Sequence, residues 1–216
     1  MECSPESLTT AERYKLMIGG IVPRPIAFVS TISPDGRLNL APFSFFNGIG
    51  SNPMTLLFCP VNNNDGTEKD SLRNAKPREE GGTGEFVVNV ATEAYIREVA
   101  ATSEALPYGE SEFELAKLHA APSRVVTPPR VKDSPIALEC RTLQVVRTNG
   151  REPAAGNVVI GEVVHVFVRD DLVNERYHID HEKLAAVGRM GGPLYCRSQD
   201  VFELPRGRAA LETDHG

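Results

Sequence analysis

Polar and aromatic residues in the first quarter of the chain could bind a flat heteroaromatic ligand. Residues 24–47 read RPIAFVSTISPDGRLNLAPFSFFN, two β-type runs joined by a Pro-Asp-Gly turn. Several residues in this segment are not explained by hairpin packing alone. They could hydrogen-bond to such a ring and cover it: Arg24, Ser30, Thr31, Ser44, Phe45, Phe46 and Asn47. Side chains alternate between the two faces of a strand, so Phe43 and Phe45 should share one face, with Ser44 and Phe46 on the other. Core phenylalanines followed by a turn are an equally good interpretation of residues 43–47 taken alone.

A second segment, KDSLRN at residues 69–74, has groups suited to a phosphate. We expect Asp70 to be the N-cap of a short helix, whose first backbone N–H groups have no partner within the helix. These amides and the positive end of the helix dipole attract anions, and side chains that could add hydrogen bonds are Lys69, Ser71 and Asn74. Taken alone, such a segment is more often a capped surface helix. Combined with the candidate ring site, it indicates a planar ring with a phosphate tail, as in flavin mononucleotide (FMN).

Two arginines are further candidates for ligand contacts. Pro23 and Pro25 stiffen the backbone on either side of Arg24, so its guanidinium suits a phosphate or carboxylate, with a surface salt bridge as the alternative. Arg189 lies in GRMGGPLY at residues 188–195, a glycine-rich loop that either closes over a site or simply connects a helix to a strand.

Other kinds of catalytic centre find little support in the sequence. His178 and His181 are three residues apart, but no Cys, Asp or Glu constellation completes four ligands, so we expect no metal site. His165 lies in a strand-like run and has no evident role. The sequence contains no GxSxG motif, so hydrolase chemistry is weakly supported, and we assign no catalytic acid or base.

Composition limits the partners and the compartment. The 216 residues are 41% hydrophobic and 24% charged, which is ordinary for one soluble globular domain. A formal net charge of −6 argues against nucleic acid or an anionic membrane as the main partner. We expect a cytoplasmic protein, because the N-terminus does not resemble a signal peptide and no apolar run is long enough to span a bilayer.

Strand-like runs outnumber helical ones, and the helices are short. We expect helices at residues 9–18, 69–75, 92–101 and 181–187, and strands at 26–32, 38–46, 55–61, 85–90, 137–148 and 158–168, with strand-like pieces in 194–204. Hairpin-type connections dominate, which indicates a mainly β antiparallel barrel or sandwich with peripheral helices. We expect a single domain over residues 1–216, with its core at about 8–205 and a charged, disordered tail at 206–216.

Taken together, these segments resemble the flavin reductase-like family of FMN-binding split-barrel proteins, which includes flavoredoxin and the reductase components of two-component monooxygenases. The matching pieces occur in order as PRPIAFVST (23–31), NLAPFSFFN (39–47), KDSLRN (69–74), EFVVNV (85–90), PSRVVTPPRVKDSPIALEC (122–140), NVVIGEVVHVFV (157–168) and GRMGGPLYCR (188–197). The resemblance implies a six-stranded antiparallel split β-barrel with Greek-key order, and a homodimer with flavin near the subunit interface.

The resemblance also implies roles for particular residues. Ser30, Thr31 and residues 44–47 would contact the isoalloxazine ring, and Lys69, Asp70, Ser71 and Asn74 would receive the phosphate. Arg24 and the Gly188–Arg189 turn would approach flavin or substrate. Many nicotinamide-using members of the family carry a histidine just before the IGEV-type strand, where Asn157 stands in this chain, so the hydride donor is open.

The activity implied by the resemblance is that of an FMN-dependent oxidoreductase, which reduces flavin or another small acceptor with NAD(P)H. One alternative is a flavoredoxin-like electron carrier that serves a protein partner, such as a monooxygenase. Another is a binding protein for a different phosphorylated aromatic compound, such as a pyridoxal phosphate.

Overall fold

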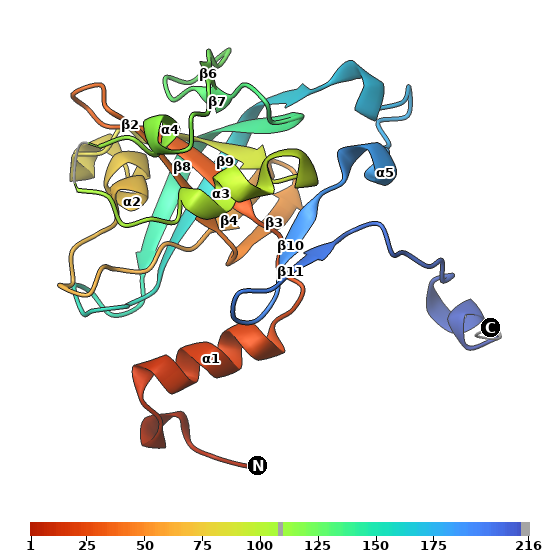
Figure 1. Cartoon of the computed structure of the whole chain (residues 1–216), viewed down its shortest axis with the longest axis horizontal. Coiled ribbons are helices and arrows are strands. Elements are labelled where there is room, and N and C mark those ends of the chain that lie inside the picture. The colour runs from red at the N-terminus through yellow and green to blue at the C-terminus, as the bar shows by residue number, and fades with distance from the viewer. Residues whose placement is uncertain (108–109, 213–216) are drawn as a thin grey trace.

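One antiparallel sheet of seven strands forms the centre of the molecule (Figure 1). The structure is a computed structural model that describes residues 1–107 and 110–212. The strand order is β2-β1-β5-β8-β9-β4-β3. The strands are β1 (Ala27–Ile32), β2 (Leu38–Phe43), β3 (Phe46–Ser51), β4 (Met54–Phe58), β5 (Glu85–Val90), β8 (Ile136–Arg147) and β9 (Asn157–Val168). A mainly β fold with short helices is therefore confirmed.

The expectation of six strands was wrong, because β3 was not recognised in the sequence. The run expected at residues 38–46 bends at Ser44 and Phe45, and a new strand begins at Phe46. This strand continues through the glycine-rich residues 48–51, whose composition is atypical of strands. Between Gly48 and Gly50 its pairing with β4 shifts register, as in a β-bulge.

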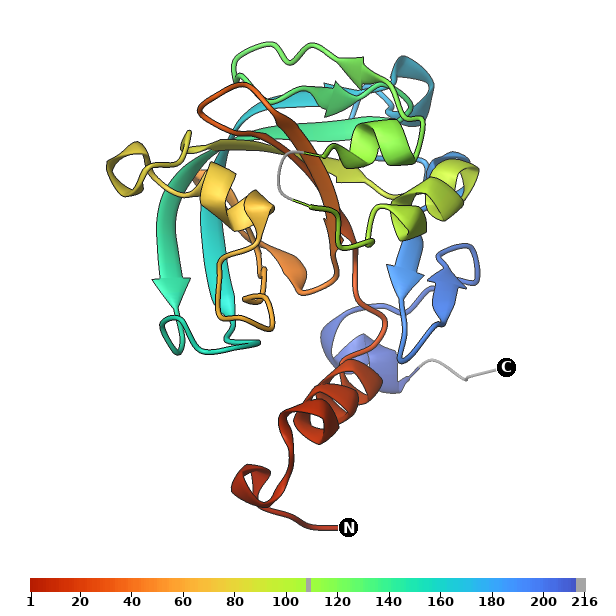
Figure 2. The same ribbon diagram turned by 60° about the vertical axis from the view of Figure 1, so that its left-hand side comes forward.

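The first and last strands of the sheet order are consecutive in sequence. β2 and β3 lie at opposite edges of the sheet, yet only Ser44 and Phe45 separate them. The sheet must therefore curl until its two edges meet at this bend, as Figure 2 shows. Phe45 O accepts a hydrogen bond from Cys59 N at 2.8 Å, which fixes the bend to the end of β4. The two edge strands are not paired with each other, so the barrel is not closed.

The interior of the curled sheet is filled by aromatic and branched side chains. The Phe58 ring lies between Phe43 and Phe86, with ring centroids 5.2 and 5.1 Å apart. A Cβ atom at Gly161 would lie 2.5 Å from Phe86 Cζ, so only glycine fits there. A second cluster, which includes Phe28, Tyr95, Val99 and Phe113, packs the outer face of β1 and β2 against the helices.

The helices are short and lie at the periphery. They are α1 (Thr10–Gly20), α2 (Asp70–Ala75), α3 (Ile96–Ala101), α4 (Glu112–Leu115) and α5 (His181–Leu184), with 3₁₀ turns at 5–7, 78–80, 93–95, 170–172 and 207–211. Thr9 caps α1 in a capping box with Glu12. The N-cap of α2 is Lys69, not Asp70, which is the first helical residue. No described helix is long and apolar enough to cross a membrane.

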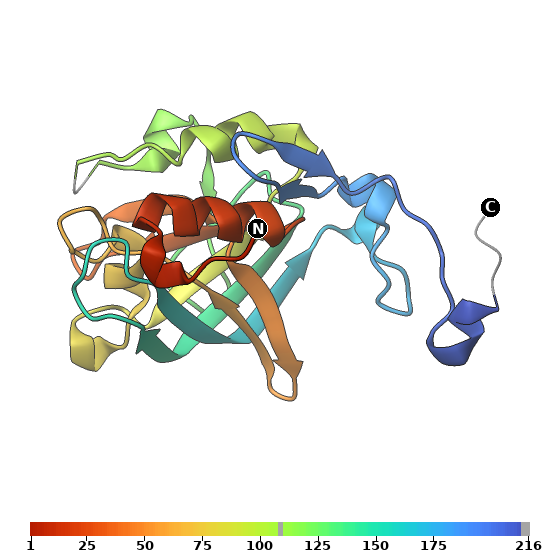
Figure 3. The same cartoon turned by 90° about the horizontal axis from the view of Figure 1, so that it is seen from below.

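Two small hairpins complete the fold, β6 (Ala120–Ala121) with β7 (Arg130–Val131) and β10 (Val187–Arg189) with β11 (Tyr195–Arg197). The GRMGGPLY segment is therefore the turn of a hairpin. Residues 207–211, within the expected disordered tail, form a 3₁₀ turn at the end of an arm that extends away from the body (Figure 3).

Candidate functional site

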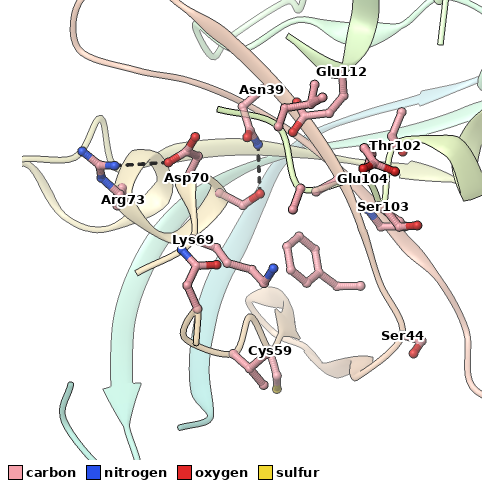
Figure 4. A pocket seen from close by; sticks show the side chains of 18 of the residues that line it. Asn39, Ser44, Cys59, Lys69, Asp70, Arg73, Thr102, Ser103, Glu104 and Glu112 are labelled. Carbon is pink, nitrogen blue, oxygen red and sulfur yellow. Dashed lines mark hydrogen bonds and ion pairs between the residues drawn. The ribbon is translucent and has the colours of Figure 1, made fainter. Parts of the chain in front are cut away.

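A cavity of about 490 Å³ lies beside the bend that joins the two edges of the sheet (Figure 4). Its walls come from the end of β2, the irregular segment before α2, the start of α2, and the chain between α3 and α4. Tyr14 of α1 adds one side chain. The volume is typical of a cavity for a cofactor-sized ligand.

The two segments predicted to bind a ring and a phosphate meet at this cavity. Ser44 and Phe45 line it from the bend, and Lys69, Asp70 and Ser71 line it from the start of α2. Phe43 lines the cavity as well, so three consecutive residues, Phe43, Ser44 and Phe45, all border it. The predicted alternation of residues 43–46 therefore does not hold, because β2 ends at Phe43 and the backbone turns there.

Thr31 and Asn74 lie beneath the cavity wall and support it. Asn39 Nδ2 donates to Thr31 Oγ1 at 3.2 Å and to Ser71 Oγ at 2.9 Å, and Asn74 Nδ2 donates to Thr31 Oγ1 at 3.0 Å. Thr31 and Asn74 are 0% and 3% exposed. Because Ser71 Oγ accepts from Asn39, its hydroxyl proton is directed to another acceptor. This buried network orients Ser71 at the cavity.

Ser30, Phe46 and Asn47 do not line the cavity. Ser30 is on the opposite face of β1 from Thr31, where its hydroxyl donates to Pro129 O at 2.5 Å and accepts from Asn89. Phe46 packs against the core inside the sheet. Asn47 is exposed, and its side chain accepts from Gly48 N. Their predicted roles in flavin binding stay predictions.

Arg24 is buried, and its guanidinium is bonded within the protein. Nη1 donates to Ile18 O and Ile21 O, both at 2.7 Å, and Nη2 donates to Met190 O at 3.0 Å. Nε donates to Ser44 Oγ at 3.1 Å. Arg24 therefore reaches the cavity indirectly, through a residue that lines it.

Arg189 is the backbone partner of Arg24, with hydrogen bonds in both directions at 3.0 and 2.8 Å. Its guanidinium lies over the Tyr195 ring, 4.4 Å from the centroid, and Nη1 donates to Leu194 O at 3.0 Å. These contacts stabilise the β10–β11 hairpin. Arg189 is not among the residues that line the cavity.

The cavity carries charges of both signs. Lys69 Nζ forms no hydrogen bond or ion pair with any residue that the structure describes. Asp70 pairs with Arg73 at 3.3 Å. Glu112 is 8% exposed, and burial raises the pKa of its carboxyl group, although the bond from Leu40 N to Oε2 at 2.9 Å opposes the shift. Lys69 is thus a half-buried cation available to an anionic ligand.

Sequence reasoning missed several residues that line the cavity. Glu104 comes from the chain between α3 and α4, Glu112 is the first residue of α4, Cys59 follows β4, and Asn39 is in β2. Among these residues, only Glu112 has a signal in the sequence. Phe113 is an apolar residue between acidic ones, which indicates a helical turn packed on the core, with Glu112 at the edge of that turn. Within the described residues, no group of three or more His, Cys, Asp or Glu could hold a metal ion.

The chain belongs to the flavin reductase like domain family, which matches residues 18–188. An uncharacterised protein of Halalkalibacterium halodurans is 42% identical over 208 residues, 95% of this chain and 96% of that protein. The structure of nitrilotriacetate monooxygenase component B from Bacillus cereus is 36% identical with a TM-score of 0.86, covering 94% of this chain and 98% of that one. The structure of the 2-nitrobenzoate 2-nitroreductase from Pseudomonas fluorescens is 29% identical with a TM-score of 0.83, covering 96% and 97%.

These likenesses confirm the family to which the sequence motifs pointed, and the fold is that of split-barrel flavin reductases. They indicate a flavin-related oxidoreductase.

Proposed function

We propose that the cavity binds FMN and that the protein is an FMN-dependent oxidoreductase, which uses NAD(P)H to reduce flavin or another small acceptor. The observation that carries the proposal is the meeting of two distant segments at one cavity in a chain of this family. Ser44 and Phe45 come from the sheet and Lys69 and Ser71 from the start of α2, and all four line the same 490 Å³ space.

The groups around the cavity fit FMN chemically. The Lys69 ammonium, which bonds to no residue within 1–107 and 110–212, and the Ser71 hydroxyl are donors suited to a phosphate. Phe43 and Phe45 offer apolar surface to a planar ring. Glu104 and Asp70 would repel a phosphate but can accept hydrogen bonds from the hydroxyl groups of a ribityl chain. α2 has only six residues, so the proposal depends on side chains and not on the helix dipole.

FMN, when bound, supplies the redox chemistry, and the protein supplies binding and orientation. Lys69 would neutralise the phosphate, and the bend at Ser44 and Phe45 would hold the ring against the wall formed by Cys59 and Val61. No residue of the cavity is needed as a general base, because hydride transfer to a flavin does not require one.

The reacting partners are part of the proposal. The solved relatives are named as a monooxygenase component and as a nitroreductase, which supports a small-molecule acceptor or a monooxygenase partner for this chain. The hydride donor is proposed as NADH or NADPH.

An absorption spectrum of the purified protein, followed by anaerobic mixing with NADH and NADPH, tests this function. We expect bound or bindable FMN, identified by chromatography after release, and bleaching of its visible band on a turnover timescale. A protein that binds FMN without bleaching with either nucleotide would be the flavoredoxin-like carrier. A protein that binds pyridoxal phosphate and no flavin would refute the proposal.

A further inference from the structure

The wall of the cavity that faces α2 has no regular secondary structure of its own. Between β4 and α2, the side chains of Cys59, Val61 and Asn63 line the cavity. The intervening residues, Pro60 and Asn62, are buried, and Asn62 points away from the cavity toward the connection between β8 and β9. Such a segment needs tethers from elsewhere to keep one shape.

Two buried asparagines provide these tethers. Asn157, the first residue of β9, donates from Nδ2 to Asn62 Oδ1 at 2.9 Å and to Pro60 O at 3.1 Å. Asn62 in turn donates from Nδ2 to Gly150 O and Glu152 O, both at 3.0 Å. The two side chains are 1% and 4% exposed. Backbone bonds from Asn157 N to Pro60 O and from Asn62 N to Ala155 O add to the connection.

Asn157 itself does not line the cavity, since its amide is turned to the outer side of the wall. Its place in the sequence, near where nicotinamide-using relatives carry a histidine, therefore does not give it a ligand contact. We propose that Asn157, acting with Asn62, is a positioning residue that holds residues 59–63 in the shape that binds flavin. This inference rests on the proposed function.

The chemistry of the contact requires an amide at position 157. The side-chain donor serves two buried acceptors, Pro60 O and Asn62 Oδ1, and reaches a third, Ala155 O, at 3.4 Å. Alanine would leave both acceptors without this donor, and aspartate would place an oxygen against two oxygens. Either change loosens the connection between the wall and β9, which then depends on the backbone bonds alone, while the core inside the sheet keeps its packing.

The test compares Asn157→Ala, Asn157→Asp and Asn62→Ala with the unmodified chain. FMN dissociation constants are measured by flavin fluorescence, well below the melting temperature of each variant. We expect each variant to bind FMN on the order of tenfold more weakly. The double variant Asn62→Ala/Asn157→Ala should lose little more than either single one, because both residues act through the same contact. Asn157→Ser, which keeps a small donor, should lose less and provides the measurement should Asn157→Ala not fold.

Ser134→Ala is the matched control. Ser134 is 1% exposed, donates to Ile136 O at 2.7 Å, accepts from Val90 N, and does not line the cavity. It should lower the melting temperature and leave FMN affinity unchanged. Hydrogen exchange of the amides at residues 59–63 gives a second measurement, and we expect faster exchange in the Asn157 variants without ligand.

Folded Asn157 variants with unchanged FMN affinity would overturn the inference, as would an equal loss in Ser134→Ala, which would mean general destabilisation. Failure of the unmodified chain to bind FMN is a different result, because it refutes the proposed function and the inference falls with it.

Discussion

Arg24 Nε donates to Ser44 Oγ at 3.1 Å, which connects the residue before β1 to the bend at the cavity. The same guanidinium also binds carbonyl groups at the end of α1 and in the β10–β11 turn. One buried side chain thus fixes three segments around Ser44. An arginine that is held rigidly between two prolines has the features of a ligand-binding residue. Here its donors are directed to the protein itself.

Replacing Arg24 by lysine should destabilise the fold more than it weakens ligand binding. A lysine ammonium cannot reproduce the fork that reaches four acceptors, so partly buried carbonyl groups lose their donor. We expect the free energy of unfolding to fall by on the order of 3 kcal/mol, measured by chemical denaturation. Arg169→Lys, at an exposed pair with Asp171, is the control and should change little. Full stability of Arg24→Lys with lost FMN binding would instead indicate a direct contact with the phosphate.

Lys69→Ala should weaken FMN binding about tenfold to a hundredfold, because a charge-assisted bond to phosphate contributes on the order of 1.5–3 kcal/mol. Riboflavin lacks the phosphate, so its affinity should stay the same, and titration of both ligands by fluorescence separates the two effects. Lys132→Ala removes an exposed lysine that does not line the cavity and serves as the control. An equal loss for riboflavin and FMN would show that Lys69 does not contact the phosphate.

Glu112→Gln should stabilise the protein at high pH and not at low pH. Burial raises the pKa of Glu112, so the folded state holds its proton more tightly than the unfolded state does. Ionisation then costs folding free energy, and this cost grows as the pH rises above the unfolded pKa and is complete above the folded pKa. Glutamine keeps an acceptor for Leu40 N without the charge.

Chemical denaturation at about pH 3.5 and about pH 8 checks this sign. The charge of Asp70 also raises the pKa of Glu112, and the charge of Lys69 lowers it. Replacing Glu112 by glutamine removes a negative charge that interacts with Lys69, so Glu112→Gln should also bind FMN about twofold to fivefold more tightly at pH 8. A variant that is less stable than the unmodified chain at pH 8 would contradict the prediction.

The homodimer that the family resemblance implies can be tested at the β3–β4 hairpin, which projects from the body (Figure 3). Ile49 and Met54 are 51% and 45% exposed there, next to an apolar hollow of about 410 Å³ that includes Phe46, Leu138 and Val163. Ile49→Asp/Met54→Asp should give a monomer in sedimentation analysis, because charges would be buried against a second copy. Leu115→Asp, at an exposed leucine of α4, should remain a dimer. An unmodified chain that is monomeric would refute the dimer.

The sequence allowed most strands to be predicted because their patterns are local. β5 and β9 are rich in valine and other apolar residues, and the capping box of α1 lies within four residues, so nearby residues determine these elements. β3 could not be found, because its pairing with β4, not its glycine-rich composition, makes residues 48–51 extended.

The cavity could be predicted only in part, for a related reason. Motifs identified Ser44, Phe45, Lys69, Asp70 and Ser71, which all line it. Glu112 joins them through a contact with Leu40, 72 positions away, and no local pattern encodes such a contact. Arg24 was assigned to the ligand for its chemistry, whereas carbonyl groups of the chain itself are its partners. Asn157, noted for its place beside the IGEV-type strand, also bonds within the chain.

The two-residue connection between β2 and β3 has a geometric consequence for the cavity. From Phe43 to Phe46 the chain has three Cα–Cα steps, which limits the distance between the two sheet edges there to about 11 Å. Covalent length therefore sets an upper limit on the gap between the two sheet edges next to Phe45. A one-residue insertion between positions 44 and 45 would widen this gap, whereas most surface insertions leave the perimeter of a barrel unchanged.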